Sequence, residues 1–226
     1  MIRCVLFDLD GTLVDTAPEI ADAINDTLLR LKRPVVPEAL ARGWIGDGTR
    51  TTLGRALAYA GLPEHELERV WPLFQRDYLE RCGTRSTVYP QVQSTLKHLA
   101  AMGVPMGLVT NKEAQFAHRV LVRHGLSEYF DVMVTGDTLP ERKPDPAGVR
   151  HALAALGVDA DDALLVGDSA IDVRTARAAG IAVWAVRYGY ASEPLVGDLQ
   201  PDRMVDRFEE ITEFASAFAD ERVSIA

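Results

Sequence analysis

The spacing of hydrophobic positions changes along this chain. Residues 2–7 are mostly apolar without alternation, which is typical of a strand that is buried on both faces. From about residue 16 to 82 the apolar positions recur at helical spacing instead, as Ile20, Ile24 and Leu28 do. This pattern predicts amphipathic helices and no strand in that stretch. The expected helices there are 14–31, 38–42, 52–60 and 64–82.

After Gly83, short apolar runs alternate with amphipathic segments, several of which end at a glycine. The expected strands are 105–110, 131–135, 163–166 and 181–186, and the expected helices are 91–102, 113–124, 146–156, 170–179 and 207–219. Residues 188–204 are rich in turn formers and predict a surface loop. Regular alternation of this kind is typical of an α/β fold with a doubly wound parallel sheet.

The two patterns together predict the domain organisation. A chain of 226 residues is long for one minimal domain and short for two full-sized ones. We expect an α/β core domain made of residues 1–15 and 83–226. A small all-helical domain, residues 16–82, would be inserted after the first strand. Gly83 and residues 13–16 are then the natural hinge candidates.

Composition narrows the class of partners and the compartment. With 47% hydrophobic residues and a formal charge of -9, the chain can bury a core and would repel nucleic acid and anionic membranes. Its two cysteines, Cys4 and Cys82, do not suggest a disulfide framework or a zinc site. No stretch reaches the length of a signal-peptide core or a membrane span. We expect a cytoplasmic protein with a small-molecule substrate, either a monomer or a homodimer.

Three carboxylates follow expected strands at the points where those strands end. Asp8 and Asp10 follow the first strand, and Asp168 follows the strand expected at 163–166. The carboxyl ends of parallel strands share one edge of a sheet, where α/β folds bind their ligands. Clustered carboxylates repel one another unless a cation holds them, and oxygen ligands of this kind suit Mg²⁺. The pattern predicts a magnesium site.

Other polar residues at the same edge suit a phosphate group. Thr110 and Asn111 follow the strand expected at 105–110, and Lys143 precedes the helix expected at 146–156. A hydroxyl donor and an ammonium group can both bind phosphate oxygens, and Mg²⁺ commonly bridges carboxylates and substrate phosphates. We predict that Thr110, Asn111 and Lys143 bind the substrate.

These residues lie in four motifs that occur in order: DLDGT at 8–12, VTN at 109–111, KP at 143–144 and GDSAID at 167–172. The sequence resembles the haloacid dehalogenase superfamily of phosphohydrolases over nearly its whole length. The helical insertion is similar in position to the small cap domain of that family. The resemblance implies an Mg²⁺-dependent hydrolysis of a phosphate monoester.

The resemblance also implies a role for each residue. Asp8 would attack phosphorus and become an aspartyl phosphate, and Asp10 would protonate the leaving oxygen and then activate water. Mg²⁺ would be held by the Asp8 carboxylate, the Asp10 backbone carbonyl and Asp168. Thr110 and Lys143 would bind the phosphoryl oxygens.

Asp172 has two interpretations that can coexist. Ser169 and Asp172 have the spacing of a helix capping box, in which the carboxylate serves the helix terminus. The same carboxylate could support the metal site from behind its ligands.

The loop at residues 44–50 is expected to select the substrate. Its two glycines let the backbone approach a small ligand, and Arg50 could bind a substrate carboxylate, although a plain turn with Arg50 in solvent also fits. The WIGxG pattern here and RYGY at 187–190 are similar to the phosphoglycolate phosphatase branch. Asp47, between the glycines, is unfavourable for an anionic substrate.

Four other functions stay open at this stage. Sugar phosphates, including an amino-sugar acid 6-phosphate, are alternative substrates. A phosphosugar mutase would share the core residues, but the cap lacks the arginine-bearing loop expected for it. A 2-haloacid dehalogenase would need neither Asp10 nor Asp168, and a regulatory receiver-like module would need no long helical insertion.

Overall fold

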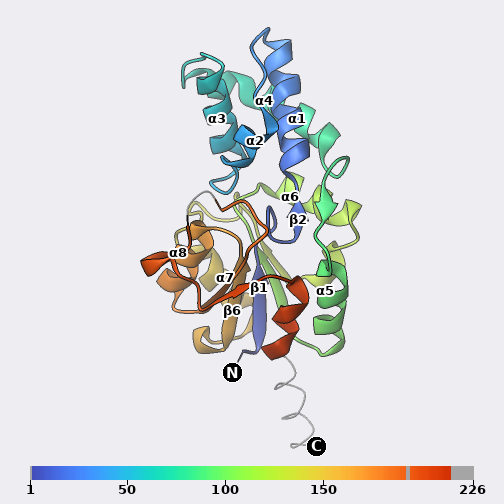
Figure 1. Ribbon diagram of the computed structural model, residues 1–226, viewed down its shortest axis with the longest axis vertical. Coiled ribbons are helices and arrows are strands. Elements are labelled where there is room, and N and C mark those ends of the chain that lie inside the picture. The colour runs from blue at the N-terminus through green and yellow to red at the C-terminus, as the bar shows by residue number, and fades with distance from the viewer. Residues whose placement is uncertain (1, 192–193, 215–226) are drawn as a thin grey trace, which may run out of the picture.

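A parallel six-stranded sheet forms the centre of the computed structural model, which describes residues 2–191 and 194–214 (Figure 1). The strand order is β5-β4-β1-β6-β7-β8. The strands are β1 (Cys4–Phe7), β4 (Met106–Val109), β5 (Val132–Val134), β6 (Ala163–Gly167), β7 (Ala182–Val186) and β8 (Arg203–Val205). Because the chain winds outward from β1 in both directions, the predicted doubly wound α/β fold is confirmed.

Each face of the sheet is covered by its own helices. Val5 and Phe7 of β1 belong to an apolar cluster with α5 (Val92–Ala101), α6 (Ala114–Arg123) and the 3₁₀ helix η4 (Phe208–Phe214). The alternate residues Cys4 and Leu6 belong to a second cluster with α7 (Ala147–Leu156) and α8 (Ala170–Ala179). Since successive side chains of a strand point to opposite faces, this explains why β1 shows no polar alternation.

Three expectations from the sequence need correction. The edge strand β8 begins inside the predicted loop 188–204 and was missed, because three residues are too few to show a period. The helix expected at 14–31 begins only at Ala17, since Val14–Asp15 forms β2 and pairs with β3 (Thr87–Val88). The helix expected at 207–219 is a 3₁₀ helix over Phe208–Phe214, and residues 215–219 lie outside the described part of the chain.

Four helices, α1 (Ala17–Arg30), α2 (Glu38–Arg42), α3 (Thr49–Tyr59) and α4 (Glu66–Arg81), form what we call the helical insertion, residues 17–81. They stand above the carboxyl edge of the sheet (Figure 1). Phe116 of α6 packs against α4, with its ring centroid 4.5 Å from that of Tyr78 and 6.5 Å from that of Phe74. The division into two domains stays a prediction. None of the described helices is long and apolar enough to cross a lipid bilayer.

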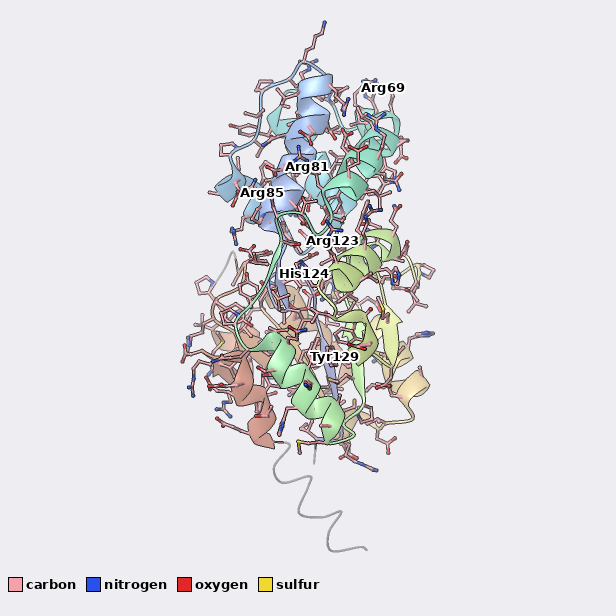
Figure 2. All side chains as sticks on the ribbon, turned by 90° about the vertical axis from the view of Figure 1, so that its right-hand side faces the viewer. Arg69, Arg81, Arg85, Arg123, His124 and Tyr129 are labelled. Atoms are coloured by element: carbon pink, nitrogen blue, oxygen red, sulfur yellow. The ribbon has the colours of Figure 1, made fainter. Side chains whose placement is uncertain are left out.

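The segment that leads back from the insertion to the sheet is fixed by a buried carboxylate. Glu19 of α1 accepts hydrogen bonds from the amides of Gly83 at 2.8 Å and Ser86 at 3.1 Å. Gly83 has φ of +75°, and a side chain there would collide with Arg123. Ser86 Oγ lies 2.8 Å from Nε2 of His124, and Figure 2 shows Arg123 and His124 at the end of α6 next to this segment.

Candidate functional site

The strand register brings the predicted residues to one place. Phe7 pairs with Leu108 of β4 on one side and with Val166 of β6 on the other. Asp8, the next residue, therefore lies between the ends of both neighbouring strands, and its amide donates to the Val166 carbonyl at 2.9 Å. Residues more than 150 positions apart in the chain thus meet at this edge.

Asp8, Asp168 and Asp172 form a buried group of carboxylates at this edge. One oxygen from each lies within 4.8 Å of the others. Burial raises the pKa of Asp8 to about 6 and that of Asp168 well above its ordinary value, with neighbouring carboxylates adding to both shifts. The positive charge near these oxygens is too small to offset the negative charge of three carboxylates. Mg²⁺ prefers oxygen ligands of this kind. The residues present therefore fit a magnesium ion.

Lys143 supplies part of that positive charge. Its Nζ lies 2.9 Å from Oδ1 of Asp8 and 2.7 Å from Oδ1 of Asp172, and its side chain is only 4% exposed. Burial alone would lower the pKa of Lys143, but the two carboxylates raise it above its ordinary value. The ammonium group is therefore held charged beside the predicted nucleophile.

The Asp172 carboxylate both caps α8 and contacts the residues of the carboxylate group. Its Oδ2 accepts the Ser169 amide at 3.1 Å and so caps α8, and it also accepts the Asp168 amide at 3.2 Å. Its Oδ1 is the partner of Lys143. The helix cap and the support of the carboxylate group are thus one arrangement.

Tyr190, in the RYGY motif, connects Asp168 to the start of the helical insertion. Its amide donates to Oδ2 of Asp168 at 2.5 Å. Its hydroxyl donates to Oδ1 of Asp15 at 2.5 Å and accepts the amides of Thr16 at 2.7 Å and Ala17 at 3.0 Å. This motif is identified in the sequence only by its similarity to a known branch of the family. No signal in the sequence predicts these long-range contacts.

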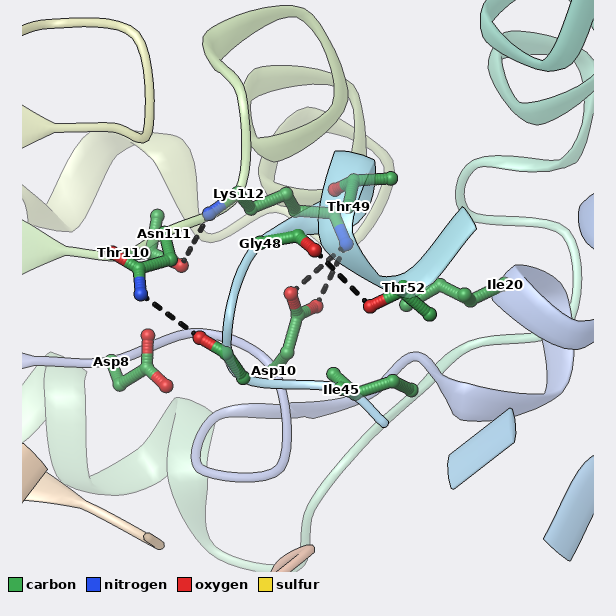
Figure 3. Close-up of a pocket in the computed structure, with 11 residues that line it drawn as sticks. Asp8, Asp10, Ile20, Ile45, Gly48, Thr49, Thr52, Thr110, Asn111 and Lys112 are labelled. Carbon is green, nitrogen blue, oxygen red and sulfur yellow. Dashed lines mark hydrogen bonds and ion pairs between the residues drawn. The ribbon is translucent and has the colours of Figure 1, made fainter. Parts of the chain in front are cut away.

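The Asp10 carboxylate turns away from the group of three carboxylates. Its Oδ1 accepts a hydrogen bond from Thr16 Oγ1 at 2.5 Å, and Lys112 Nζ lies 2.9 Å from Oδ1 and 3.1 Å from Oδ2 (Figure 3). Burial alone would lower the pKa of Lys112, but Asp10 raises it above its ordinary value. Sequence reasoning missed Lys112, whose one signal is that it directly follows Thr110 and Asn111.

Thr110 lines the cavity beside Asp8, and its Oγ1 accepts the Lys112 amide at 3.3 Å. The Asn111 amide group is engaged within the protein. It donates to the carbonyls of Gly46 at 3.0 Å and Lys143 at 2.9 Å, and its oxygen accepts the Lys143 amide at 2.9 Å. Asn111 therefore ties loop 44–50 to the loop that carries Lys143.

A small cavity of about 10 Å³ lies between these residues and residues 44–50, which is room for about one water molecule. The predicted loop there ends at Gly48, because α3 begins at Thr49 and not at residue 52. Gly48 lines the cavity. Its φ is +95°, and a Cβ there would lie 3.1 Å from the Asn111 carbonyl oxygen. The lining residues are Asp8, Asp10, Ile20, Ile45, Gly46, Gly48, Thr49, Thr52, Thr110, Asn111 and Lys112.

Arg50 differs from the other predicted site residues, because it neither lines the cavity nor contacts the group of carboxylates with Lys143. Its guanidinium pairs with Glu68 of α4 and lies 5.1 Å from the ring centroid of Trp71. Asp47 likewise turns to a partner within the insertion, Arg55. The charge of Asp47 is thus paired, which removes the objection it raised to an anionic substrate.

The family model for haloacid dehalogenase-like hydrolases matches residues 5–186. The chain belongs to this family. The matched span of this haloacid dehalogenase-like hydrolase runs from β1 to the end of β7 and contains all four motifs, so the predicted family is confirmed.

Relatives of this haloacid dehalogenase-like hydrolase match it over most of its length. A phosphoglycolate phosphatase from Nitrosococcus oceani is 38% identical and covers 95% of this chain and 97% of its own. A plasmid-encoded phosphoglycolate phosphatase from Cupriavidus necator is 43% identical over 91% of this chain and 89% of its own. The crystal structure of a predicted phosphoglycolate phosphatase from Haemophilus somnus superposes with a TM-score of 0.89 at 34% identity, covering 95% of this chain and 98% of that one.

Proposed function

We propose that this hydrolase cleaves a small phosphate monoester, 2-phosphoglycolate, through an aspartyl phosphate on Asp8. The observation that carries the proposal is the position of the Asp8 carboxylate, paired with Lys143 and lying among Asp168 and Asp172 at the carboxyl edge of the sheet. A carboxylate there can attack phosphorus when Lys143 and a bound cation together offset its repulsion from the phosphate.

The reaction has two steps with balanced proton transfers. An Asp8 oxygen bonds to phosphorus as the bond to the leaving oxygen breaks, and Asp10 donates a proton to that oxygen. A water then attacks the phosphorus of the aspartyl phosphate and gives a proton to Asp10, while the bond between the Asp8 oxygen and phosphorus breaks. Inorganic phosphate is released, Asp8 is again a carboxylate, and Asp10 again carries the proton. Thr110 and Lys143 bind the phosphoryl oxygens during both steps.

Asp8, Asp168 and the Asp10 backbone carbonyl would hold Mg²⁺. When bound, the ion neutralises carboxylate charge and polarises the phosphoryl group. Asp172 acts behind these ligands, because its two oxygens already serve Lys143 and the cap of α8.

Two observations support phosphoglycolate as the substrate. Two relatives of 38% and 43% identity carry that name. The far wall of the cavity contains Thr49 and the start of α3, where the helix dipole favours an anion such as the glycolate carboxylate.

A substrate panel with Mg²⁺ tests this proposal. We expect kcat/KM for 2-phosphoglycolate to exceed that for glucose 6-phosphate and 4-nitrophenyl phosphate by about tenfold or more, since binding the carboxylate adds specificity. Chelation by EDTA should abolish turnover, and added Mg²⁺ should restore it. No phosphate release from any ester would refute the phosphatase, whereas equal rates on all esters would refute only the substrate.

Arg50 provides a second test at this end of the cavity. We expect Arg50→Ala to change KM for phosphoglycolate by less than about twofold, because its guanidinium pairs with the exposed Glu68 and does not line the cavity. Thr49→Val should raise KM more, since Thr49 lines the cavity. Steady-state kinetics of both variants measure the two changes in KM. If Arg50→Ala raises KM more than Thr49→Val does, Arg50 binds the substrate carboxylate.

A further inference from the structure

Lys112 is buried at a position where an unpaired charge would be costly. Its side chain has no exposed surface, and its Nζ lies 5.0 Å from the centroid of the Tyr78 ring on α4. Among the described residues that line the cavity, it is the only cation. Burial of an ammonium group is tolerated only where a partner compensates it, and here that partner is Asp10.

The backbone around Lys112 is fixed to the sheet. Its amide donates to Thr110 Oγ1 at 3.3 Å, and its carbonyl accepts the Gly136 amide at 2.8 Å. The ammonium group therefore has a defined position relative to Asp8, because Thr110 and Asp8 follow the paired strands β4 and β1.

Asp10 is held from two sides by this arrangement. Thr16 Oγ1, at the start of the helical insertion, and Lys112 Nζ both contact Oδ1, at 2.5 and 2.9 Å. Within the described part of the chain, the hydrogen-bond partner of the other oxygen, Oδ2, is Lys112 Nζ alone, at the longer distance of 3.1 Å. The Asp10 side chain is 12% exposed and lines the cavity, so Thr16 and Lys112 fix the direction in which its carboxyl group faces that cavity.

We propose that Lys112 is a positioning residue that orients the Asp10 carboxyl group for proton transfer to the leaving oxygen. The proposal rests on the proposed phosphomonoesterase reaction, in which Asp10 is the proton donor. General acid catalysis typically contributes about 10²- to 10⁴-fold, and its contribution grows with the basicity of the leaving group. Loss of this orientation should therefore lower kcat/KM most for esters with poor leaving groups.

The experiment compares Lys112→Met with wild type on two esters that lack a carboxylate, ethyl phosphate and 4-nitrophenyl phosphate. The value of kcat/KM reports the first phosphoryl transfer, in which the alcohol departs. We expect a loss of about 10- to 100-fold on ethyl phosphate, because ethoxide needs a proton. On 4-nitrophenyl phosphate we expect less than about a threefold loss, because nitrophenolate leaves without one.

Three further exchanges separate positioning from a merely structural role. Asp10→Asn should show the same dependence on the leaving group, and adding Lys112→Met to it should cost nothing further, because both act on one proton transfer. Lys97→Met, at an exposed lysine of α5, should behave as wild type. Lys112→Arg should recover part of the activity on ethyl phosphate.

Equal losses on both esters, or additive losses in the double variant, would overturn the proposal. A loss confined to KM for phosphoglycolate would also overturn it, because Lys112 would then bind the substrate carboxylate. Failure of the wild-type protein to hydrolyse any ester would instead refute the proposed function.

Discussion

Replacing Asp8 by asparagine is expected to lower kcat for phosphate release by about 10⁴-fold or more, the scale seen when a catalytic nucleophile is removed. The amide is nearly the same size as the carboxylate but cannot form an acyl phosphate. The side chain is buried beside Lys143, so the exchange also removes one carboxylate partner of that lysine. Inorganic phosphate release with saturating Mg²⁺ is the measurement.

The matched control for this exchange is Asp161→Asn, at an exposed carboxylate after α7. It should keep full activity. Circular dichroism and thermal unfolding of Asp8→Asn should show a folded protein, which separates lost chemistry from lost structure. Activity within tenfold of wild type would mean that Asp8 is not the nucleophile.

Replacing Lys143 by methionine should reduce the free energy of unfolding by about 3–5 kcal/mol in the presence of EDTA, the cost of leaving a buried charge without its partner. The exchange removes the ammonium group between Asp8 and Asp172 while keeping most of the side-chain volume. Urea unfolding followed by circular dichroism measures the loss, with Lys97→Met as the control.

Two conditions should reduce the loss of unfolding free energy in Lys143→Met. Mg²⁺ should restore part of the stability, because an ion that binds only the folded protein stabilises it. Lowering the pH from about 8 to 5.5 should also reduce the deficit. Burial raises the pKa values of Asp8 and Asp168, so the folded protein takes up more protons than the unfolded one over this range, and stability rises as pH falls. An unchanged free energy of unfolding in EDTA would contradict the pairing.

The sheet could be predicted because its strands carry a local signal. Runs such as Cys4–Phe7 and Ala163–Gly167 are fully buried, and each is followed by the polar residues of a motif. The strand Arg203–Val205 has no such signal, since it is short and lies at the edge of the sheet. Its pairing with Ala182–Val186 is decided by tertiary contacts alone.

Part of the candidate site could likewise be predicted from the sequence, and part of it could not. Asp8, Thr110 and Asp168 follow strands, so their convergence follows from the register of a parallel sheet. The roles of Lys112 and Tyr190 depend on partners about 100 to 175 positions away, and spacing along the chain says nothing about those contacts. A lysine that follows a strand is usually solvated, so the sequence alone does not indicate a buried position for Lys112.

The size of the closed cavity decides how a complex with substrate can be obtained. A space of about 10 Å³ cannot admit a phosphate ester, so the contact between Gly46 and Asn111 must open before a ligand reaches Asp8. Crystals grown in this closed form would hold the helical insertion in place, and soaking them would leave the site without ligand. Co-crystallisation of an inactive variant with phosphoglycolate, which lets the ligand bind in solution before the crystal lattice forms, is the route that the geometry favours.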